Sequence, residues 1–156
     1  MTNLKHAIIL MLISAVPFIE LRGGIPYGAA MDLPFWECVI IAILANLLPV
    51  PFIILFIRKI FDFCRKKNWL TKQITWLETR VMKKSAVVKK YEAIGLAIFV
   101  GIPLPGTGAW SGALLAALLD IRLKTSLPAI FAGVVIAGLL VGGVSYGFLG
   151  FLNFIL

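Results

Sequence analysis

The sequence predicts an all-α integral membrane protein, and three observations support this fold class. Hydrophobic residues make up 61% of the 156-residue chain, and its mean hydropathy is +1.02. Charged residues make up 14%, whereas a soluble domain carries about 25%. The excess charge is gathered in one segment between long apolar regions. Together these observations exclude a soluble enzyme, a disordered chain and a disulfide-built secreted domain.

Residues 58–92 form the segment that carries the excess charge. They include eleven bases and three acids, a balance equal to the net charge of +8 of the whole chain. Basic segments beside apolar spans usually lie in the cytoplasm, so we predict a cytoplasmic segment 58–92 and both termini on the opposite side. Apolar residues at helical spacing between Leu70 and Val81, with Trp69 and Trp76, indicate an interfacial helix that contacts anionic lipid headgroups. A solvated loop that only sets the topology is the alternative. Nucleic acid is not an expected partner, because no recognition motif accompanies the charge.

Two of the four apolar regions are long enough to cross a bilayer as helices. A hydrocarbon core of about 30 Å requires about 20 helical residues. Residues 33–57 and residues 127–156 meet this requirement. Asn46 lies inside the first of these regions, and we predict that its amide hydrogen-bonds to a neighbouring helix.

The other two apolar regions, residues 7–30 and 93–119, contain helix-breaking residues in their middle. We predict that each is a re-entrant helical hairpin, because clusters of Pro and Gly mark broken helices at transport sites. The predicted turns are Glu20–Pro26 in the first region and Pro103–Gly106 in the second. One long kinked helix that crosses the membrane is the alternative in each place.

The two halves of the chain share the same order of elements: a broken apolar region, a short polar link and a spanning helix. Three small residues coincide when residues 22–29 are laid over residues 106–113. We therefore predict one transmembrane domain with repeat one at 1–57, the basic linker at 58–92 and repeat two at 93–156. Because a single spanning helix separates the repeats, they would be inverted relative to each other.

Glu20 and Arg22 are the charged residues inside the broken regions. Each costs roughly 2.5 to 3.5 kcal/mol at the centre of a lipid-facing helix, so a role in function is the preferred interpretation. The alternative is a purely structural pair, whose members neutralise each other in an extended loop formed by Gly23, Gly24 and Pro26.

The two predicted turns would also place two helix N-termini at one site. Pro26 suits the first turn of a helix, and Thr107 can cap the helix that follows the second turn. Helix N-termini favour an anion, and an arginine adds a fork that suits phosphate or carboxylate. Tyr27 and Trp110 could line the same cavity, with packing in the core or at the interface as the alternative. The candidate substrate-binding residues are Glu20, Arg22, Gly23, Gly24, Pro26, Tyr27, Pro103, Pro105, Gly106, Thr107, Gly108, Trp110 and Ser111.

No metal, cofactor or enzymatic activity is expected. Cys38, Cys64 and His6 lack the spacing of a metal site. Residues 101–108 lack the lysine of a phosphate-binding loop, and no nucleophile–base pair is visible.

We therefore expect a transporter for an amphipathic anion, most simply a lipid phosphate. Arg22 and the helix N-termini would hold the headgroup, and Glu20 would be the coupling or gating acid. One alternative is a proton-coupled exporter of cationic amphiphiles, with Glu20 as the exchanging carboxylate. Another is a membrane scaffold that transports nothing. Because one protomer has only two full spans, we expect a homo-oligomer, formed through the glycines of the last helix.

Two stretches carry a resemblance to a known family. Glu20-Leu21-Arg22-Gly23-Gly24-Ile25-Pro26-Tyr27-Gly28 and Gly101-Ile102-Pro103-Leu104-Pro105-Gly106-Thr107-Gly108-Ala109-Trp110-Ser111-Gly112 resemble the two signature stretches of the bacterial family of small multi-drug export proteins. That family is distantly similar to the DedA/VTT superfamily. The resemblance implies a multi-pass protein of the bacterial cytoplasmic (inner) membrane, with inverted repeats whose re-entrant loops meet in the bilayer. It also implies lipid translocation, with undecaprenyl phosphate as the substrate.

Overall fold

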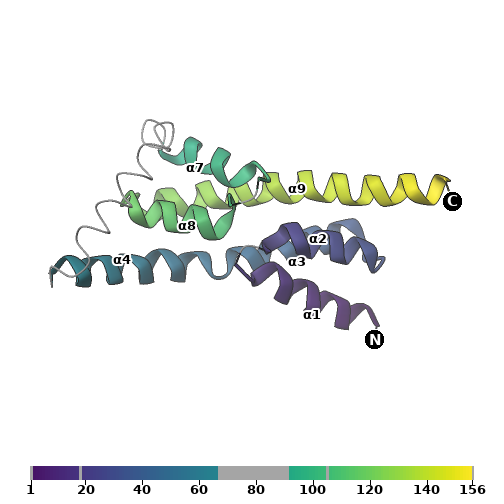
Figure 1. The fold of residues 1–156 in the computed structure, drawn as a ribbon, viewed down its shortest axis with the longest axis horizontal. Helices are drawn as coiled ribbons and strands as arrows, with labels where there is room; N and C mark the ends of the chain where they lie inside the picture. The colour runs from purple at the N-terminus through teal and green to yellow at the C-terminus, as the bar shows by residue number, and fades with distance from the viewer. Residues whose placement is uncertain (1, 18, 67–91, 105, 156) are drawn as a thin grey trace.

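The computed structural model describes residues 2–17, 19–66, 92–104 and 106–155. These residues form helices and contain no strand, so the all-α prediction is confirmed for the described part of the chain (Figure 1). The predicted interfacial helix near Trp69 and Trp76 lies outside the described residues. The helices are α1 (Thr2–Ala15), α2 (Glu20–Ala30), α3 (Phe35–Leu47), α4 (Val50–Lys66), α7 (Glu92–Gly101), α8 (Ala109–Leu118) and α9 (Leu123–Ile155).

Two helical units are long and apolar enough to cross a membrane. One is Phe35–Ile60, which joins α3 to α4, and the other is Leu123–Phe151 in α9. They measure 26 and 29 residues, against the roughly 20 that a bilayer core requires. The predictions for regions 33–57 and 127–156 are therefore confirmed as to length and composition, although α4 continues beyond residue 57 to Lys66.

The remaining helices form two hairpins at opposite ends of the molecule. In Figure 1, α1 runs from one end to the middle and α2 returns to that end, while α7 and α8 do the same from the other end. Both chain termini lie at the end that holds α1 and α2. Residues 102–108 separate α7 from α8, so the predicted turn at Pro103–Gly106 is correctly placed.

The predicted turn at Glu20–Pro26 is wrong, because these residues lie inside α2. The chain breaks one turn earlier, at residues 16–19, where Pro17 disfavours helix in the residue before it. The glycines of α2 serve packing instead. A Cβ on Gly24 would lie 2.0 Å from the Ser14 Oγ of α1, so glycine at this position lets the two helices approach closely.

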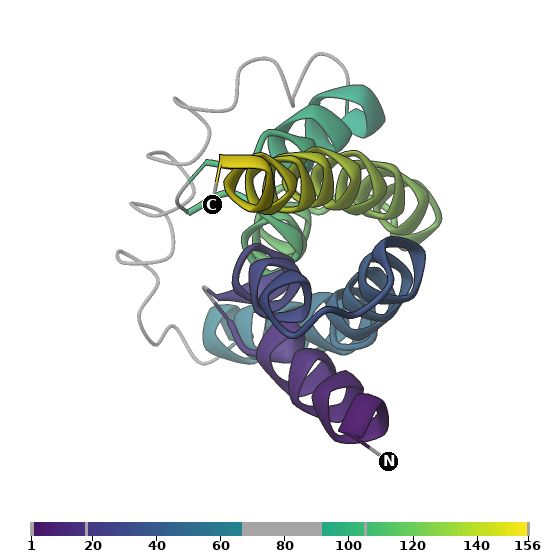
Figure 2. The ribbon, with the colours of Figure 1, turned by 90° about the vertical axis from the view of Figure 1, so that its right-hand side faces the viewer.

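The hairpins pack against the long units in a crossed pattern. The first helix of each hairpin packs against the long unit that follows it in the chain, α1 on α3 and α7 on α9. The second helix packs against the long unit of the other half, α2 on α9 and α8 on α4. Figure 2 looks along the molecule from the end with both termini, and it places α2 and α3 between α1 and α9.

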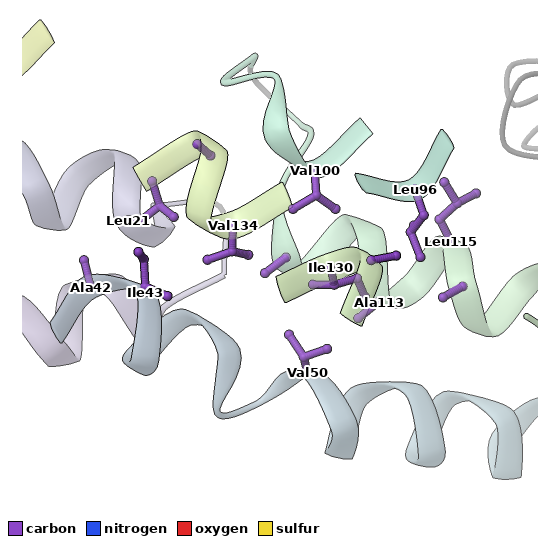
Figure 3. Close-up of a cluster of buried hydrophobic side chains, with 14 of the residues drawn as sticks. Leu21, Ala42, Ile43, Val50, Leu96, Val100, Ala113, Leu115, Ile130 and Val134 are labelled. Atoms are coloured by element: carbon purple, nitrogen blue, oxygen red, sulfur yellow. The ribbon is translucent and has the colours of Figure 1, made fainter. Parts of the chain in front are cut away.

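One apolar core joins all of these elements at the middle of the molecule. Its side chains are nearly or fully inaccessible to solvent, and they come from both hairpins and both long units. Van der Waals contacts among these closely packed side chains stabilise the crossed packing. Figure 3 shows Leu21 of α2, Ile43 of α3, Val50 of α4, Val100 of α7, Ala113 of α8 and Val134 of α9 in this core.

The two hairpins end in matching turns. Asp32 after α2 and Asp120 after α8 are both left-handed, with φ of 56° and 52°. The next residues, Leu33 and Ile121, are buried, and each donates its N–H to a carbonyl five residues back at 3.0 Å. This is the hydrogen bond of a Schellman motif, with the hydrophobic residue that usually accompanies it.

Each of these turns is tied to the long unit of the other half of the chain. The Tyr146 hydroxyl of α9 donates to the Leu33 carbonyl at 2.6 Å. The Arg58 guanidinium of α4 donates to the Ile121 carbonyl, and its Nε lies 3.8 Å from the Asp120 carboxylate. Leu33 and Ile121 are 88 residues apart, and so are Arg58 and Tyr146. The two ties therefore have the same spacing along the chain, and each joins the end of one hairpin to a long unit.

Candidate functional site

Glu20 and Arg22 lie where the two hairpins meet. Glu20 is the first residue of α2, with φ of 52°, and only 3% of its surface is exposed. Arg22 lies in the first turn of the same helix and is half-buried. The alternative of a structural pair put both residues in an extended loop, which is wrong because α2 begins at Glu20 and contains Arg22. Their hydrogen bonds reach the other hairpin.

Glu20 caps the N-terminus of α8. Its Oε1 accepts a hydrogen bond from the backbone N–H of Trp110, the second residue of α8, at 3.0 Å. The N-cap residue of α8 is Gly108, which has no side chain to supply this bond. A carboxylate at a partly buried helix N-terminus stabilises the helix by up to about 2 kcal/mol, because it satisfies an N–H and opposes the helix dipole.

Arg22 binds the other side of the same break. Its Nη2 donates to Thr107 Oγ1 at 2.9 Å and to the carbonyl of Ile102 at 3.4 Å, and its Nη1 donates to the carbonyl of Thr107. The Thr107 hydroxyl also lies 2.7 Å from the Ile102 carbonyl and 2.8 Å from the Leu104 carbonyl. The prediction that Thr107 caps α8 is therefore wrong: its single O–H donates to the carbonyl of either Ile102 or Leu104, both in the loop that follows α7.

Gly108 allows Glu20 to reach α8. Its φ is +140°, which a residue with a side chain rarely adopts, and glycine has no steric penalty there. A Cβ at this position would lie 2.0 Å from Glu20 Oε2. The glycine is therefore required both by the backbone conformation and by the carboxylate beside it.

A pocket of about 430 Å³ opens beside these contacts. It is mostly apolar, and of the described residues that line it, Glu20 is the only acid and Arg22 the only base. We call it the central pocket. It is lined by Pro17, Glu20, Arg22, Ile53, Phe56, Ile57, Gly106, Thr107, Trp110, Ser111 and Leu114.

The structure brings together about half of the candidate residues in this pocket and separates the rest. Gly108 lies behind Glu20, and Gly24 packs against α1. Tyr27 lies elsewhere, with its hydroxyl 3.0 Å from His6 Nδ1 of α1. The candidates found in the pocket are Glu20, Arg22, Gly106, Thr107, Trp110 and Ser111. Gly23, Pro26 and Pro103 do not line it, and Pro105 lies outside the described residues.

Five apolar lining residues, Pro17 among them, were missed by the sequence interpretation. Ile53, Phe56 and Ile57 lie on one face of α4, and Leu114 lies on α8. The spacing of three and four residues in α4 is the available signal. It could not distinguish a pocket wall from a lipid-facing stripe, because both are apolar.

The chain matches a family model described as "Putative small multi-drug export protein" over residues 20–140. The chain belongs to this family. The matched range contains the second hairpin break and, except for Pro17, all of the described residues that line the central pocket. No curated protein and no solved structure matched the chain, and the relationship to the DedA/VTT superfamily stays a prediction.

Membership of this export family and the two long apolar units make the chain a membrane protein with a transporter-like role. Within the described residues, no group of three or more His, Cys, Asp or Glu side chains could hold a metal ion. The polar groups that the described lining residues bring to the central pocket are one carboxylate, one guanidinium, two hydroxyls, the indole N–H of Trp110 and the backbone groups of a broken helix.

Asn46 of α3 is a further polar residue at this site. It is fully buried, and neither its Nδ2 nor its Oδ1 has a hydrogen-bond partner. Because Asn46 lies beside Glu20 of α2, the predicted hydrogen bond to a neighbouring helix stays a prediction. Asn46 lines a small cavity, too narrow to hold a water molecule, together with Glu20, Gly108 and Ala109.

Proposed function

We propose that this protein exports amphipathic cations across the membrane in exchange for protons, with Glu20 as the exchanging carboxylate. The observation that carries the proposal is the composition of the central pocket: among its described lining residues, which are mostly apolar, Glu20 is the one acid. A carboxylate has about four acceptor positions, and the Trp110 N–H uses one of them. An amphipathic cation would place its apolar body against Ile53 and Phe56 and its charge against Glu20.

The hydrogen bonds of Arg22 favour a cationic substrate over an anionic one. The guanidinium donates to two backbone carbonyls and to Thr107 Oγ1. A phosphate held by both Nη groups would have to displace these acceptors. It would also compete with the Glu20 carboxylate, which already occupies the N-terminus of α8. A cation can bind without displacing the acceptors of Arg22 and without removing Glu20 from the N-terminus of α8.

We further propose that the two hairpins are re-entrant and that the two halves are inverted repeats. α1 has 14 residues and α8 has 10, which gives lengths of roughly 20 and 15 Å, short of a bilayer core of about 30 Å. The crossed packing of the hairpins and the matching ties at Tyr146 and Arg58 support an internal two-fold relation. In this arrangement the hairpins enter from opposite faces and meet at the middle of the membrane.

The two ties would then act as gates on the two faces. The Arg58–Ile121 tie lies just after α8 and the Tyr146–Leu33 tie just after α2, and these two helices end on opposite sides of the molecule (Figure 1). Breaking one tie while the other stays closed would open the pocket to one face at a time, as alternating access requires.

The membrane setting follows from the charge distribution. We expect the bacterial cytoplasmic membrane, with the basic segment 58–92 on the cytoplasmic side and in contact with anionic lipid headgroups. We also expect a homo-oligomer. Gly143, Gly147 and Gly150 of α9 have no side chain or backbone atom near the position of a Cβ, which leaves room for a second helix. The proposal assigns no enzymatic step and no cofactor to the chain.

A second candidate substrate is a lipid phosphate such as undecaprenyl phosphate. The observation that favours it is that Arg22 and the N-terminus of α8 lie at the same pocket. An anion could bind there once Glu20 had left α8, because the freed N–H groups and the guanidinium would then both face it.

Transport by purified protein in liposomes tests the proposal. With an imposed pH gradient, we expect uptake of a cationic dye by the wild type and loss of that uptake in Glu20→Gln. Glu37→Gln is the matched control, since Glu37 is exposed at the start of α3. Unchanged dye uptake in Glu20→Gln would overturn the proposal.

The same preparation distinguishes the alternatives. Transport of a phosphate-headgroup lipid that is lost in Arg22→Ala, without any dye transport, would replace the first candidate by the second. If neither substrate moves in the wild type and both substitutions change only stability, the chain is a scaffold and the transport proposal fails.

A further inference from the structure

Asn46 is a buried polar side chain that the proposed function does not use. Its relative exposure is 0%, and both polar atoms of its amide lack a partner. An amide removed from water without hydrogen bonds costs free energy, and buried polar groups in native proteins are nearly always paired. A second arrangement of the site, in which Asn46 is paired, accounts for its presence.

The surroundings of Asn46 contain few possible partners. It shares its cavity with Glu20 and Arg22 of α2, and the rest of the wall is made by apolar side chains and by the start of α8. Arg22 is bound to the loop after α7. Glu20 lines the same cavity and is held at α8 by the hydrogen bond from the Trp110 N–H, so it is the side chain that can turn to Asn46.

We propose that Glu20 alternates between two partners according to its protonation. When ionised, it accepts the Trp110 N–H and caps α8, as the structure shows. When protonated, its O–H donates to Asn46 Oδ1 and its carbonyl oxygen accepts from Asn46 Nδ2. The inference rests on the proposed function, because it gives the proton a place during exchange. The proton binds to the carboxylate, and no other bond forms or breaks except hydrogen bonds.

The charges around Glu20 suit this alternation. A helix N-terminus favours a carboxylate over a neutral acid, whereas a neutral amide offers one donor and one acceptor that match a protonated carboxyl group. Arg22 on the same helix is the charged group that faces Glu20. α3 contributes Asn46 to the cavity, α7 contributes Val100, α8 contributes Gly108 and Ala109, and α9 contributes Val134 and Ala137, none of which titrates.

The consequence for transport is that a proton would release α8. Once Glu20 turns to Asn46, the first N–H groups of α8 lose their cap, and the link between the hairpins at this point is broken. Asn46 is in this sense a positioning residue, which acts on the substrate through Glu20.

Infrared difference spectroscopy between acidic and neutral pH tests the inference without requiring a transport substrate. The carbonyl band of protonated Glu20 is identified by its loss in Glu20→Gln. We expect Asn46→Leu to shift this band to higher frequency, because the hydrogen bonds from the amide are gone. A band at the wild-type frequency in Asn46→Leu would overturn the inference.

Two further variants control for a general effect of losing a buried polar side chain and for a failure of Asn46→Leu to fold. Ser14→Ala removes another fully buried side chain without a partner, which packs against Gly24 and does not line the cavity, and we expect it to leave the band unchanged. A shift of equal size in Ser14→Ala would also count against the inference. Asn46→Ala gives the same test if Asn46→Leu does not fold. Because the band reports Glu20 directly, it can shift as expected even if the dye assay refutes cation export.

Discussion

The break between α1 and α2 and the break between α7 and α8 are satisfied in different ways. In the first, the backbone bridges its own gap: the N–H of Val16 donates to Ile13, that of Glu20 to Val16 and that of Gly23 to Ile19, at 3.1 to 3.2 Å. In the second, key groups on either side of the gap are bound by charged side chains of the first hairpin. The difference shows that the first hairpin is largely complete by itself, whereas the second depends on the first.

This dependence explains where the charges lie. The loop 102–108 contains no charged residue, although the end of α7 and the start of α8 leave carbonyls and N–H groups there that need partners. Glu20 and Arg22 are placed two residues apart so that the acid reaches the N–H groups and the base reaches the carbonyls. The charged pair that would be costly in lipid is therefore stabilised by a broken helix.

Replacing Gly108 should disrupt this dependence most strongly. In Gly108→Ala the new methyl group would meet the Glu20 carboxylate and force an unfavourable φ, so we expect the free energy of unfolding to fall by about 3 kcal/mol. Thermal unfolding in detergent measures the effect. Gly143→Ala is the control, since nothing lies within 4 Å of its Cβ position. Equal stability of the two variants would contradict the proposed contact.

Removing Arg22 should have the next largest effect. Arg22→Ala leaves the carbonyls of Ile102 and Thr107 without their donor, and we expect a loss of about 2 to 3 kcal/mol in unfolding free energy. Limited proteolysis at the loop 102–108 should increase as well. Arg122→Ala is the control because Arg122 is exposed. Resistance of the loop to protease in Arg22→Ala would show that the guanidinium does not stabilise it.

Neutralising Glu20 should affect stability less than it affects transport. In Glu20→Gln the amide oxygen can still accept the Trp110 N–H, so only the charge–dipole part of the cap is lost, about 1 kcal/mol. Unfolding measured beside the dye assay separates the two effects. A stability loss as large as that of Arg22→Ala would mean that the transport result cannot be read as a loss of proton exchange.

Removing either end tie should give the smallest change in stability. Each removal should raise the access of solvent at its own end of the molecule only. Tyr146→Phe and Arg58→Met each remove bonds to one turn, with an expected cost of about 1 kcal/mol. Labelling of single cysteines placed at Met31 and Lys124, in a background without the natural cysteines, measures access at each end. We expect Tyr146→Phe to raise labelling at Met31 and Arg58→Met to raise it at Lys124. Equal changes at both ends in either variant would argue against separate gates.

The sequence was sufficient to predict the break between α7 and α8 but not the one between α1 and α2. In the second hairpin, prolines and glycines cluster where α7 ends, and they interrupt the helix there as their residue types predict. In the first, Gly24 was interpreted as part of a turn, whereas it packs inside a helix against Ser14. A glycine that permits a turn and a glycine that permits close packing are identical in a single sequence.

The importance of Glu20 and Arg22 could be predicted, but their partners could not. The cost of charge in lipid identified both residues. Their partners are mostly backbone atoms 80 to 90 positions away, and backbone groups leave no residue-type signal. Asn46 was underrated for a related reason, because its proximity to Glu20 arises only when α2 and α3 pack together.

The reliance of one hairpin on the other also sets an order for biosynthesis. Glu20 leaves the ribosome 90 residues before the Trp110 amide that will bind it. At about 5 to 20 residues per second, the acid has no helix end to cap for roughly 5 to 20 s. During that interval Glu20 and Arg22, at the start of α2, have to stay in contact with water or with the insertion machinery. The first hairpin can reach its final depth in the membrane only after translation has passed the second break.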